Sequence, residues 1–299
     1  MNTKTAIITG ASSGLGLECA RALLRRAPSW HIVLAVRDLG RGADAVKELD
    51  APQRCTVMEM DLASLASVRA FTATVRSSSL PPLQAIVCNA GLQVVSGREW
   101  TQDGVEMTFG VNHLGHFALI QGLLDELTRP ARILVVSSGT HDPSKHTGMP
   151  DPRYTSAADL AHPPAEQSAD DGRRRYTTSK LCNMLFAYEL DRRLAGGVTV
   201  NAYDPGLMPG SGLARDYPPM QRLAWRYLLP ALRVLSGVRS TRTSGRYLAA
   251  LVHDSRYDGV TGQYFAGPRP IKSSADSYDR DKALDLWQTS ERLLTYATK

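Results

Sequence analysis

The sequence predicts an α/β fold: a mostly parallel sheet with helices on both faces. Along the first two thirds of the chain, short apolar segments typical of buried strands alternate with amphipathic segments of helical length. A glycine-rich turn joins the first strand to the first helix. Because crossovers between parallel strands are right-handed, this alternation indicates a doubly wound sheet. The sequence has no linker, repeat or low-complexity tract, so we expect one domain over residues 1–299.

Seven segments are predicted as strands because each is a short apolar run between turn-forming or polar residues. The first reads Thr-Ala-Ile-Ile-Thr and lies almost at the N-terminus. In chain order, the predicted strands are Thr5–Thr9, His31–Val36, Arg54–Met60, Leu83–Cys88, Arg132–Ser137, Val198–Tyr203 and Thr261–Ala266.

Six segments are predicted as helices from their amphipathic spacing, and the first of them ends before Pro28. In chain order, they are Leu15–Ala27, Gly40–Leu49, Ser64–Ser77, Gly104–Leu127, Arg174–Leu194 and Asp281–Leu294. Two segments interrupt the alternation. Residues 139–172 are rich in Pro, His, Asp and Ser and predict a long insertion loop. Residues 207–236 begin with Gly and Pro and become amphipathic, which predicts a substrate lid. Alternatively, the basic part at 220–235 lies on an anionic membrane surface.

The composition limits the classes of function. The net charge of +6 is modest and scattered, which argues against a nucleic-acid partner. Cys19, Cys55, Cys88 and Cys182 form no CxxC pair, so we expect free thiols in a reducing compartment. No apolar run approaches the roughly 20 residues of a membrane span. No basic, apolar leader precedes the first strand, so we expect a cytoplasmic protein.

The turn after the first strand predicts a site for a dinucleotide. It runs Thr9-Gly10-Ala11-Ser12-Ser13-Gly14-Leu15-Gly16 and opens the first helix. Glycines allow a tight turn and close approach of a ligand, and the N-terminus of the helix offers free N–H groups to a pyrophosphate. The predicted contacts are Gly10, Ser12, Ser13, Gly14, Leu15 and Gly16. The alternative is a tight turn that binds nothing.

The ends of the next strands predict the remaining cofactor contacts. Arg37 follows the second strand, where its guanidinium suits a 2′-phosphate, so NADP is favoured over NAD. Asp38 is acidic and follows it directly, which leaves NAD open, and a surface role for Arg37 is the other alternative. Asp61, with Leu62, either contacts adenine or only begins the loop after the third strand. Small residues at Asn89-Ala90-Gly91 leave room for a flat group on the backbone.

Tyr176 and Lys180 predict the reactive centre, because positions i and i+4 share one face of a helix. A neighbouring ammonium favours the phenolate, and lowering a phenol pKa by ~3 units needs ~4 kcal/mol. Such a tyrosine can exchange a proton with a carbonyl oxygen that receives a hydride. Ser138, with Ser137 as the competing assignment, ends the fifth strand and can bind the same oxygen. The alternative is two exposed residues on an amphipathic helix.

Asn112 lies inside a predicted helix, where asparagine is unfavourable, so it either kinks the helix, binds a water or has a simple packing or capping role. His113 and His116 have a spacing that could ligate a metal. No acidic or cysteine partner lies near them in the sequence, so we expect no metal.

These motifs, in this order, resemble the short-chain dehydrogenase/reductases: TGxxxGxG at Thr9–Gly16, NAG at Asn89–Gly91, Asn112, Ser138, YxxxK at Tyr176–Lys180, and Pro205-Gly206. The resemblance covers nearly the whole chain. It implies a single Rossmann domain with a seven-stranded sheet, a catalytic Asn112–Ser138–Tyr176–Lys180 tetrad, and hydride transfer from NAD(P)H. It also implies that Lys180 holds the nicotinamide ribose, that Asn112 holds a relay water, and that Pro205, Gly206 and Met208 contact the cofactor.

Within that family, the sequence is most similar to light-dependent protochlorophyllide reductases, with retinol dehydrogenases and WW-domain-containing oxidoreductases nearby. Segments such as Asn112-His-Leu-Gly-His-Phe117 and Ser179-Lys-Leu-Cys-Asn-Met-Leu185 carry this likeness, and the Arg37-Asp38 pair resembles their NADP-selecting step. Two positions differ. Leu207 stands where the pigment reductases usually have a cysteine, and Gly210, followed by Ser211, stands where the family often has a nicotinamide-binding threonine.

The sequence therefore predicts an NADPH-dependent reductase of a ketone or aldehyde, reversible as an alcohol dehydrogenase, with an apolar or aromatic substrate. The first alternative is light-driven reduction of a tetrapyrrole double bond, against which Leu207 counts. The second is an NADP-binding protein without turnover. The family resemblance implies dimers or tetramers, with monomers among the relatives named.

Overall fold

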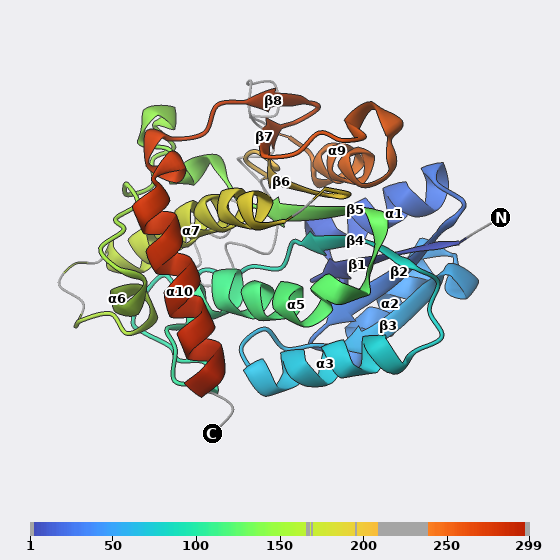
Figure 1. The fold of residues 1–299 in the computed structure, drawn as a ribbon, viewed down its shortest axis with the longest axis horizontal. Helices are drawn as coiled ribbons and strands as arrows, with labels where there is room; N and C mark the ends of the chain where they lie inside the picture. The colour runs from blue at the N-terminus through green and yellow to red at the C-terminus, as the bar shows by residue number, and fades with distance from the viewer. Residues whose placement is uncertain (1–2, 166–167, 169, 195, 209–238, 297–299) are drawn as a thin grey trace, which may run out of the picture.

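The computed structural model describes residues 3–165, 168, 170–194, 196–208 and 239–296, and one eight-stranded sheet organises them (Figure 1). In chain order, the strands are β1 (Lys4–Thr9), β2 (Trp30–Val36), β3 (Cys55–Glu59), β4 (Leu83–Cys88), β5 (Leu127–Val136), β6 (Val198–Asp204), β7 (Gln263–Ala266) and β8 (Arg269–Ile271). Their order across the sheet is β3-β2-β1-β4-β5-β6-β7-β8. The strands from β1 to β7 pair in parallel, so the predicted doubly wound α/β sheet is confirmed. The short antiparallel β8 extends the predicted seven strands to eight.

Helices cover both faces of this sheet (Figure 1). One face carries α3 (Leu65–Ser77), α5 (Gly115–Leu123), α7 (Asp171–Arg193) and α10 (Arg280–Tyr296). The other carries α1 (Gly14–Arg26), α2 (Leu39–Leu49) and α9 (Thr241–His253). Successive strand residues point to opposite faces, so Ile7 joins the first core and Ile8 the second. Both side chains are completely buried, and each such burial contributes roughly 1.5–3 kcal/mol.

The predicted helix Gly104–Leu127 is interrupted, and this is a correction. The segment forms α4 (Met107–Phe109), a π turn η2 (Gly110–Leu114), α5, and a 3-10 turn η3 (Leu124–Glu126), after which Leu127 already belongs to β5. The π turn contains Asn112, the residue whose place in a helix interior was unfavourable. π turns are frequent at functional sites because they re-aim backbone groups.

The segment 139–172 is more structured than the predicted loop. Two 3-10 turns, η4 (Gly139–His141) and η5 (Pro143–Lys145), are followed by the short helix α6 (Ala157–Ala161), and α7 begins at Asp171. Further 3-10 turns are η1 (Pro52–Arg54), η9 (Ser255–Tyr257) and η10 (Ala275–Tyr278). Helix α9 was not predicted, although Leu248, Ala249 and Val252 are buried at helical spacing. Of the predicted lid at 207–236, only Leu207 and Met208 lie within the described residues, and the segment 220–235 lies outside them.

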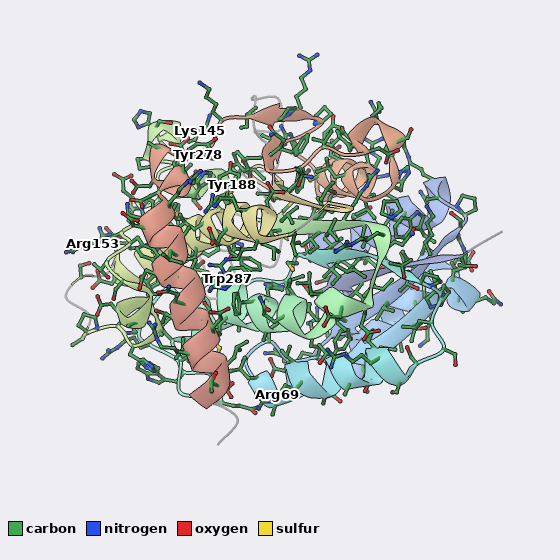
Figure 2. The ribbon with its side chains drawn as sticks, in the orientation of Figure 1. Arg69, Lys145, Arg153, Tyr188, Tyr278 and Trp287 are labelled. Atoms are coloured by element: carbon green, nitrogen blue, oxygen red, sulfur yellow. The ribbon has the colours of Figure 1, made fainter. Side chains whose placement is uncertain are left out.

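Helix α10 crosses α7 and holds it against the sheet (Figure 2). Trp287 of α10 packs edge-on against Phe117, and the guanidinium of Arg193 lies 4.3 Å from the Trp287 ring centroid. Tyr188 of α7 stacks on Tyr278 of η10 with centroids 5.1 Å apart. These contacts fix α7, the helix that carries the candidate reactive residues.

All four cysteines lie among the described residues and are free thiols, as predicted. Burial raises the pKa of Cys19, Cys88 and Cys182 far above its ordinary value, so these three thiols are unreactive. Within the described part of the chain, no helix is both long and apolar enough to span a membrane.

Candidate active site

The turn between β1 and α1 has the geometry that an anionic cofactor group needs. Gly10 and Gly14 have φ angles of +66° and +60°, which other residues rarely adopt. Ser13 caps α1 through its extended backbone, but its side chain makes no capping hydrogen bond. The first N–H groups of α1 therefore keep their donors for a ligand, and the positive end of the helix dipole favours a pyrophosphate there.

Gly16 lets α1 pack directly on the end of β4. A Cβ at this position would lie 2.6 Å from Nδ2 of Asn89 and 2.7 Å from the carbonyl oxygen of Gly10. The same Asn89 amide donates to the carbonyl oxygen of Thr9 at 2.7 Å. Turn and strand end thus form one compact floor, which includes Ala90 and the exposed Gly91. The predicted residues at 10–16 and 89–91 are brought together, and they fit a dinucleotide.

We expect Gly16→Ala to lower NADPH affinity at least tenfold, because the added methyl must displace backbone that has no room to move. Gly196→Ala is the matched control, since a Cβ there meets nothing within 4 Å. Fluorescence titration with NADPH checks both variants. Equal affinity of Gly16→Ala and wild type would show that the cofactor does not bind against this turn.

Arg37 and Asp38 follow β2, and their side chains have different surroundings. The Asp38 carboxylate accepts from the backbone N–H of Arg41 at 3.0 Å and so caps α2. That oxygen is used by the protein and is a poor ribose ligand. Arg37 is exposed and contacts no carboxylate among the described residues. After β3, the Asp61 carboxylate accepts from the N–H of Ala63 at 2.9 Å, beside the buried Leu62. This bond stabilises the loop between β3 and α3, which is one of the two roles predicted for Asp61.

Tyr176 and Lys180 lie one turn apart on α7, and both are almost completely buried. The Lys180 ammonium lies 5.6 Å from the centroid of the Tyr176 ring and donates to the carbonyl oxygen of Val136 at 3.4 Å. Burial lowers the pKa of Lys180 to about 8, and the nearby carboxylate of Asp204 opposes this shift. The pair is therefore a desolvated cation beside a phenol, as the spacing predicted.

Asn112 ties the π turn to the two neighbouring elements. Its Oδ1 accepts from the N–H of Leu92 at 2.8 Å, and its Nδ2 donates to the carbonyl oxygen of Leu92 and to Ser179 Oγ, each at 2.9 Å. A Cβ on Gly91 would lie 3.2 Å from this Oδ1 and 3.5 Å from Nζ of Lys180. Asn112, Lys180 and Gly91 therefore converge on one point.

The geometry separates the two candidate serines. Ser137 is buried, and its hydroxyl donates to the carbonyl oxygen of Lys180 at 2.8 Å. Ser138 is half-buried, and among the described residues its Oγ accepts only a long 3.3 Å hydrogen bond from the N–H of Thr140. Its hydroxyl proton is therefore available to a substrate, which favours Ser138 over Ser137.

Two buried histidines in the site were missed by sequence reasoning as positioning residues. Nδ1 of His116 donates to the carbonyl oxygen of Asn112 at 3.2 Å, because a carbonyl oxygen can only accept. In the neutral ring Nε2 then accepts from Oγ1 of Thr9 at 2.9 Å, a hydroxyl that also lies 3.4 Å from the carbonyl oxygen of Val87 and accepts from the N–H groups of Asn89 and Ala90. Burial lowers the pKa of His116 to about 4, which agrees with this neutral form.

The second histidine, His141, holds Ser138 in the same manner. Its Nδ1 donates to the Ser138 carbonyl oxygen at 2.6 Å, and its Nε2 accepts from the N–H of Ser274 at 3.2 Å. Burial lowers the His141 pKa, so the ring is neutral as both bonds require. No local pattern reveals either histidine, because one of the two partners of each ring, Thr9 for His116 and Ser274 for His141, lies far away in the sequence.

His113, the other candidate metal ligand, is directed away from His116. Its Nε2 contacts Ser290 Oγ of α10 at 2.8 Å, and burial lowers its pKa to about 3. Among the described residues, no group of three or more His, Cys, Asp or Glu side chains is placed to hold a metal ion.

The loop after β6 lies at the same carboxyl edge of the sheet. Gly206 has a φ of +75°, and its N–H is held by Asp204 at 2.8 Å, while the carbonyl of Pro205 accepts from Ser244 at 2.6 Å. Met208 is half-buried against the second core, and Leu207 is 42% exposed. Gly210 and Ser211 lie outside the described residues.

Comparison with known proteins agrees with this geometry. The family model described as short chain dehydrogenase matches residues 4–149. Protochlorophyllide reductase A of Oryza sativa is 36% identical, over 96% of this chain and 80% of its own. The WW domain-containing oxidoreductase of Gallus gallus is also 36% identical, over 98% of this chain and 69% of its own.

Solved structures show the same relationship. A protein from Mycobacterium paratuberculosis is 30% identical with a TM-score of 0.72, over 97% of this chain and 93% of its own. A blue fluorescent protein from a metagenomic library, solved with NADPH, is 25% identical with a TM-score of 0.64, over 89% of this chain and 96% of its own. With its sheet order, its glycine turn and relatives of this identity and coverage, the chain belongs to the short chain dehydrogenase family of oxidoreductases.

Proposed function

We propose that this protein transfers a hydride between NADP(H) and the carbonyl carbon of a ketone or aldehyde, and runs in reverse as an alcohol dehydrogenase. The observation that carries the proposal is the buried Tyr176–Lys180 pair beside Asn112, at the carboxyl edge of the sheet where Ser138 follows β5. Open α/β sheets bind their ligands at this edge.

Each side chain has a role that its surroundings support. The bound nicotinamide supplies or accepts the hydride. Ser138 donates a hydrogen bond to the substrate oxygen, and Tyr176 donates the proton that this oxygen needs as the carbon is reduced. The ammonium of Lys180 stabilises the phenolate that remains, because opposite charges attract strongly in a desolvated site. Asn112 holds the π turn and α7 in register for proton resupply.

The structure and the relatives support NADP(H) as the cofactor. A carboxylate oxygen of Asp38 accepts the hydrogen bond that caps α2, and Arg37 next to it is exposed. We expect Arg37→Ala to raise the KM for NADPH roughly tenfold or more while leaving the KM for NADH unchanged, because only NADPH has the 2′-phosphate that a guanidinium binds. Steady-state kinetics with both cofactors measures the ratio, and an unchanged ratio would contradict this role.

A second candidate function is reduction of a tetrapyrrole double bond in light. Several relatives of similar identity are named protochlorophyllide reductase, which favours this candidate. Leu207, at the position where the pigment reductases usually have a cysteine, argues against it. The WW domain-containing oxidoreductase is equally similar, so identity alone does not choose between them.

One assay tests the two functions together. The protein is mixed with NADPH or NADH and either a panel of aliphatic and aromatic ketones and aldehydes or protochlorophyllide, in darkness and in light, and nicotinamide absorbance is followed. Carbonyl reduction in darkness with NADPH preferred is the expected result. Turnover of the pigment only under illumination would replace the proposal by the second candidate.

Location in the cytoplasm, the oligomeric state, the predicted lid and the single domain stay predictions.

A further inference from the structure

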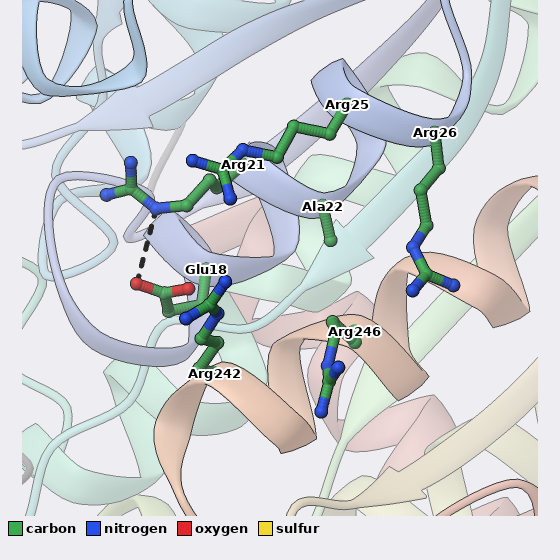
Figure 3. A pocket seen from close by; sticks show the side chains of 7 residues that line it. All are labelled: Glu18, Arg21, Ala22, Arg25, Arg26, Arg242 and Arg246. Carbon is green, nitrogen blue, oxygen red and sulfur yellow. Dashed lines mark hydrogen bonds and ion pairs between the residues drawn. The ribbon is translucent and has the colours of Figure 1, made fainter.

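A groove rich in arginine runs between α1 and α9, on the face of the sheet opposite α7 (Figure 3). Helix α1 contributes Arg21, Arg25 and Arg26, and α9 contributes Arg242 and Arg246. Glu18 is the one acidic residue among those that line it. The groove therefore gathers guanidinium groups from two segments that are far apart in the sequence.

The groove is preformed because the two helices are in close contact. A Cβ on Gly245 of α9 would lie 2.5 Å from Cβ of Glu18 and 2.7 Å from its backbone carbonyl carbon. The two helix backbones therefore lie in close contact at this point. This contact sets the spacing of the backbones from which the exposed arginine side chains extend.

The positive charges in the groove are only partly neutralised. Arg21 pairs with Glu18 at 3.3 Å and with Glu48, so both carboxylates serve one guanidinium. Arg246 donates to the neutral hydroxyl of Thr243 at 3.4 Å and forms no ion pair with a described residue. In the part of the chain that the structure describes, Arg25, Arg26 and Arg242 form no ion pair.

The helix dipoles favour the positive charge of some of these arginines and disfavour that of another. Arg25 and Arg26 lie in the last turn of α1, where cations are favourable. Arg242 lies in the first turn of α9, which contains no acidic residue, so its charge adds to the positive end of that helix. The repulsion between Arg242 and the positive end of α9 lowers the stability of the free protein. A bound anion is attracted by both, so the same arrangement favours the complex.

We propose that this groove binds a ligand with two or more phosphate groups, clamped between the α1 and α9 arginines by forked, charge-assisted hydrogen bonds. Guanidinium groups bind phosphate oxygens in pairs, and several such groups on two packed helices favour an oligophosphate over a single anion. The site is distinct from the cofactor turn. That turn uses the first residues of α1, whereas the groove lies one to three turns further along.

The test uses tripolyphosphate as the probe, by calorimetry on the protein saturated with NADP⁺ so that the cofactor turn is filled. We expect one saturable site that weakens at least tenfold in the double variant Arg25→Gln/Arg242→Gln. Arg269→Gln/Arg280→Gln is the control, because it removes the same charge from exposed positions outside the groove. Its affinity for the probe should match wild type, and the variants should have equal thermal stability within about 1 kcal/mol.

A second arm identifies the source of the phosphate groups. Vesicles of phosphatidylglycerol in phosphatidylcholine are sedimented with each variant, at low and high salt. Vesicle binding that is lost in Arg25→Gln/Arg242→Gln alone assigns the groove to lipid headgroups, and vesicle binding that is absent or equal in all variants assigns it to a free oligophosphate. The absence of saturable tripolyphosphate binding, or an equal loss in the control variant, overturns the proposal.

Discussion

Replacing Lys180 by methionine should abolish turnover and at the same time make the folded protein more stable. Turnover is lost because no ammonium remains beside Tyr176 to stabilise its phenolate. Stability rises because the variant no longer buries a charge. The packing is retained, since methionine is unbranched and of similar length. The carbonyl of Val136 keeps a hydrogen bond from Asn183 Nδ2 at 3.0 Å.

The size of the gain follows from the pKa. Burial lowers the Lys180 pKa from 10.5 to about 8, and each unit corresponds to about 1.4 kcal/mol, so the charged form costs about 3 kcal/mol. Below about pH 8, lysine is charged in both the folded and the unfolded chain, and the full cost is present. Between about pH 8 and 10.5 the unfolded chain binds more protons, so wild-type stability rises with pH and the advantage of the variant disappears.

Urea unfolding at about pH 7 and about pH 10 measures this difference. We expect Lys180→Met to be more stable by about 1–3 kcal/mol at the lower pH and to keep only about a quarter of that advantage at the higher pH. Lys47→Met is the control, because Lys47 is exposed and forms an exposed ion pair with Asp44. A variant that is less stable than wild type at about pH 7, or that retains turnover, would contradict the assigned role of Lys180.

The second large effect concerns His116, which we expect to act as a positioning residue between the cofactor floor and the reactive centre. Its ring links Thr9, which holds the backbone of Asn89 and Ala90, to the carbonyl oxygen of Asn112. His116→Phe removes both hydrogen bonds. We expect kcat to fall ~10–100-fold and stability to fall by about 1–3 kcal/mol, because buried polar partners are left unpaired.

Two conservative variants separate positioning from plain stability. His116→Asn places an amide donor near the position of Nδ1, so it can keep the bond to Asn112. His116→Gln places an amide oxygen near the position of Nε2, so it can keep the bond from Thr9. We expect His116→Asn to keep kcat near the wild-type value while the KM for NADPH rises. We expect His116→Gln to keep the KM for NADPH near the wild-type value while kcat falls. If both constants change in all three variants in proportion to melting temperature, His116 is only structural.

The sheet could be predicted from the sequence because parallel strands buried on both faces leave continuous apolar runs, as in Lys4–Thr9 and Leu83–Cys88. The reactive pair of the candidate site could also be predicted, because Tyr176 and Lys180 are only one helical turn apart. The sequence also favoured Ser138, but Ser137 stayed open as the competing assignment, because the bond that occupies the Ser137 hydroxyl depends on the carbonyl of Lys180, which only the fold brings near.

The features that were missed, or left as one of several alternatives, depend on contacts between distant segments. The π turn at Asn112 is held by the backbone of Leu92 and by Ser179, and neither contact leaves a periodic signal. Helix α9 did leave one, in Leu248, Ala249 and Val252, but it follows a segment whose amphipathic pattern was assigned to a lid. The arginine groove needs α1 and α9 side by side, which the alternation of elements does not specify.

The most direct measurement compares turnover of NADPH with an accepted carbonyl substrate, in darkness, by wild type and by Tyr176→Phe. Tyr188→Phe is the matched control, because Tyr188 is a second buried tyrosine on α7 whose hydroxyl contacts Ser273, away from Lys180. We expect Tyr176→Phe to bind NADPH as wild type does and to lose ~10²–10⁴-fold in kcat, while Tyr188→Phe retains turnover. If Tyr176→Phe keeps turnover within about threefold of wild type, the proton does not come from this phenol.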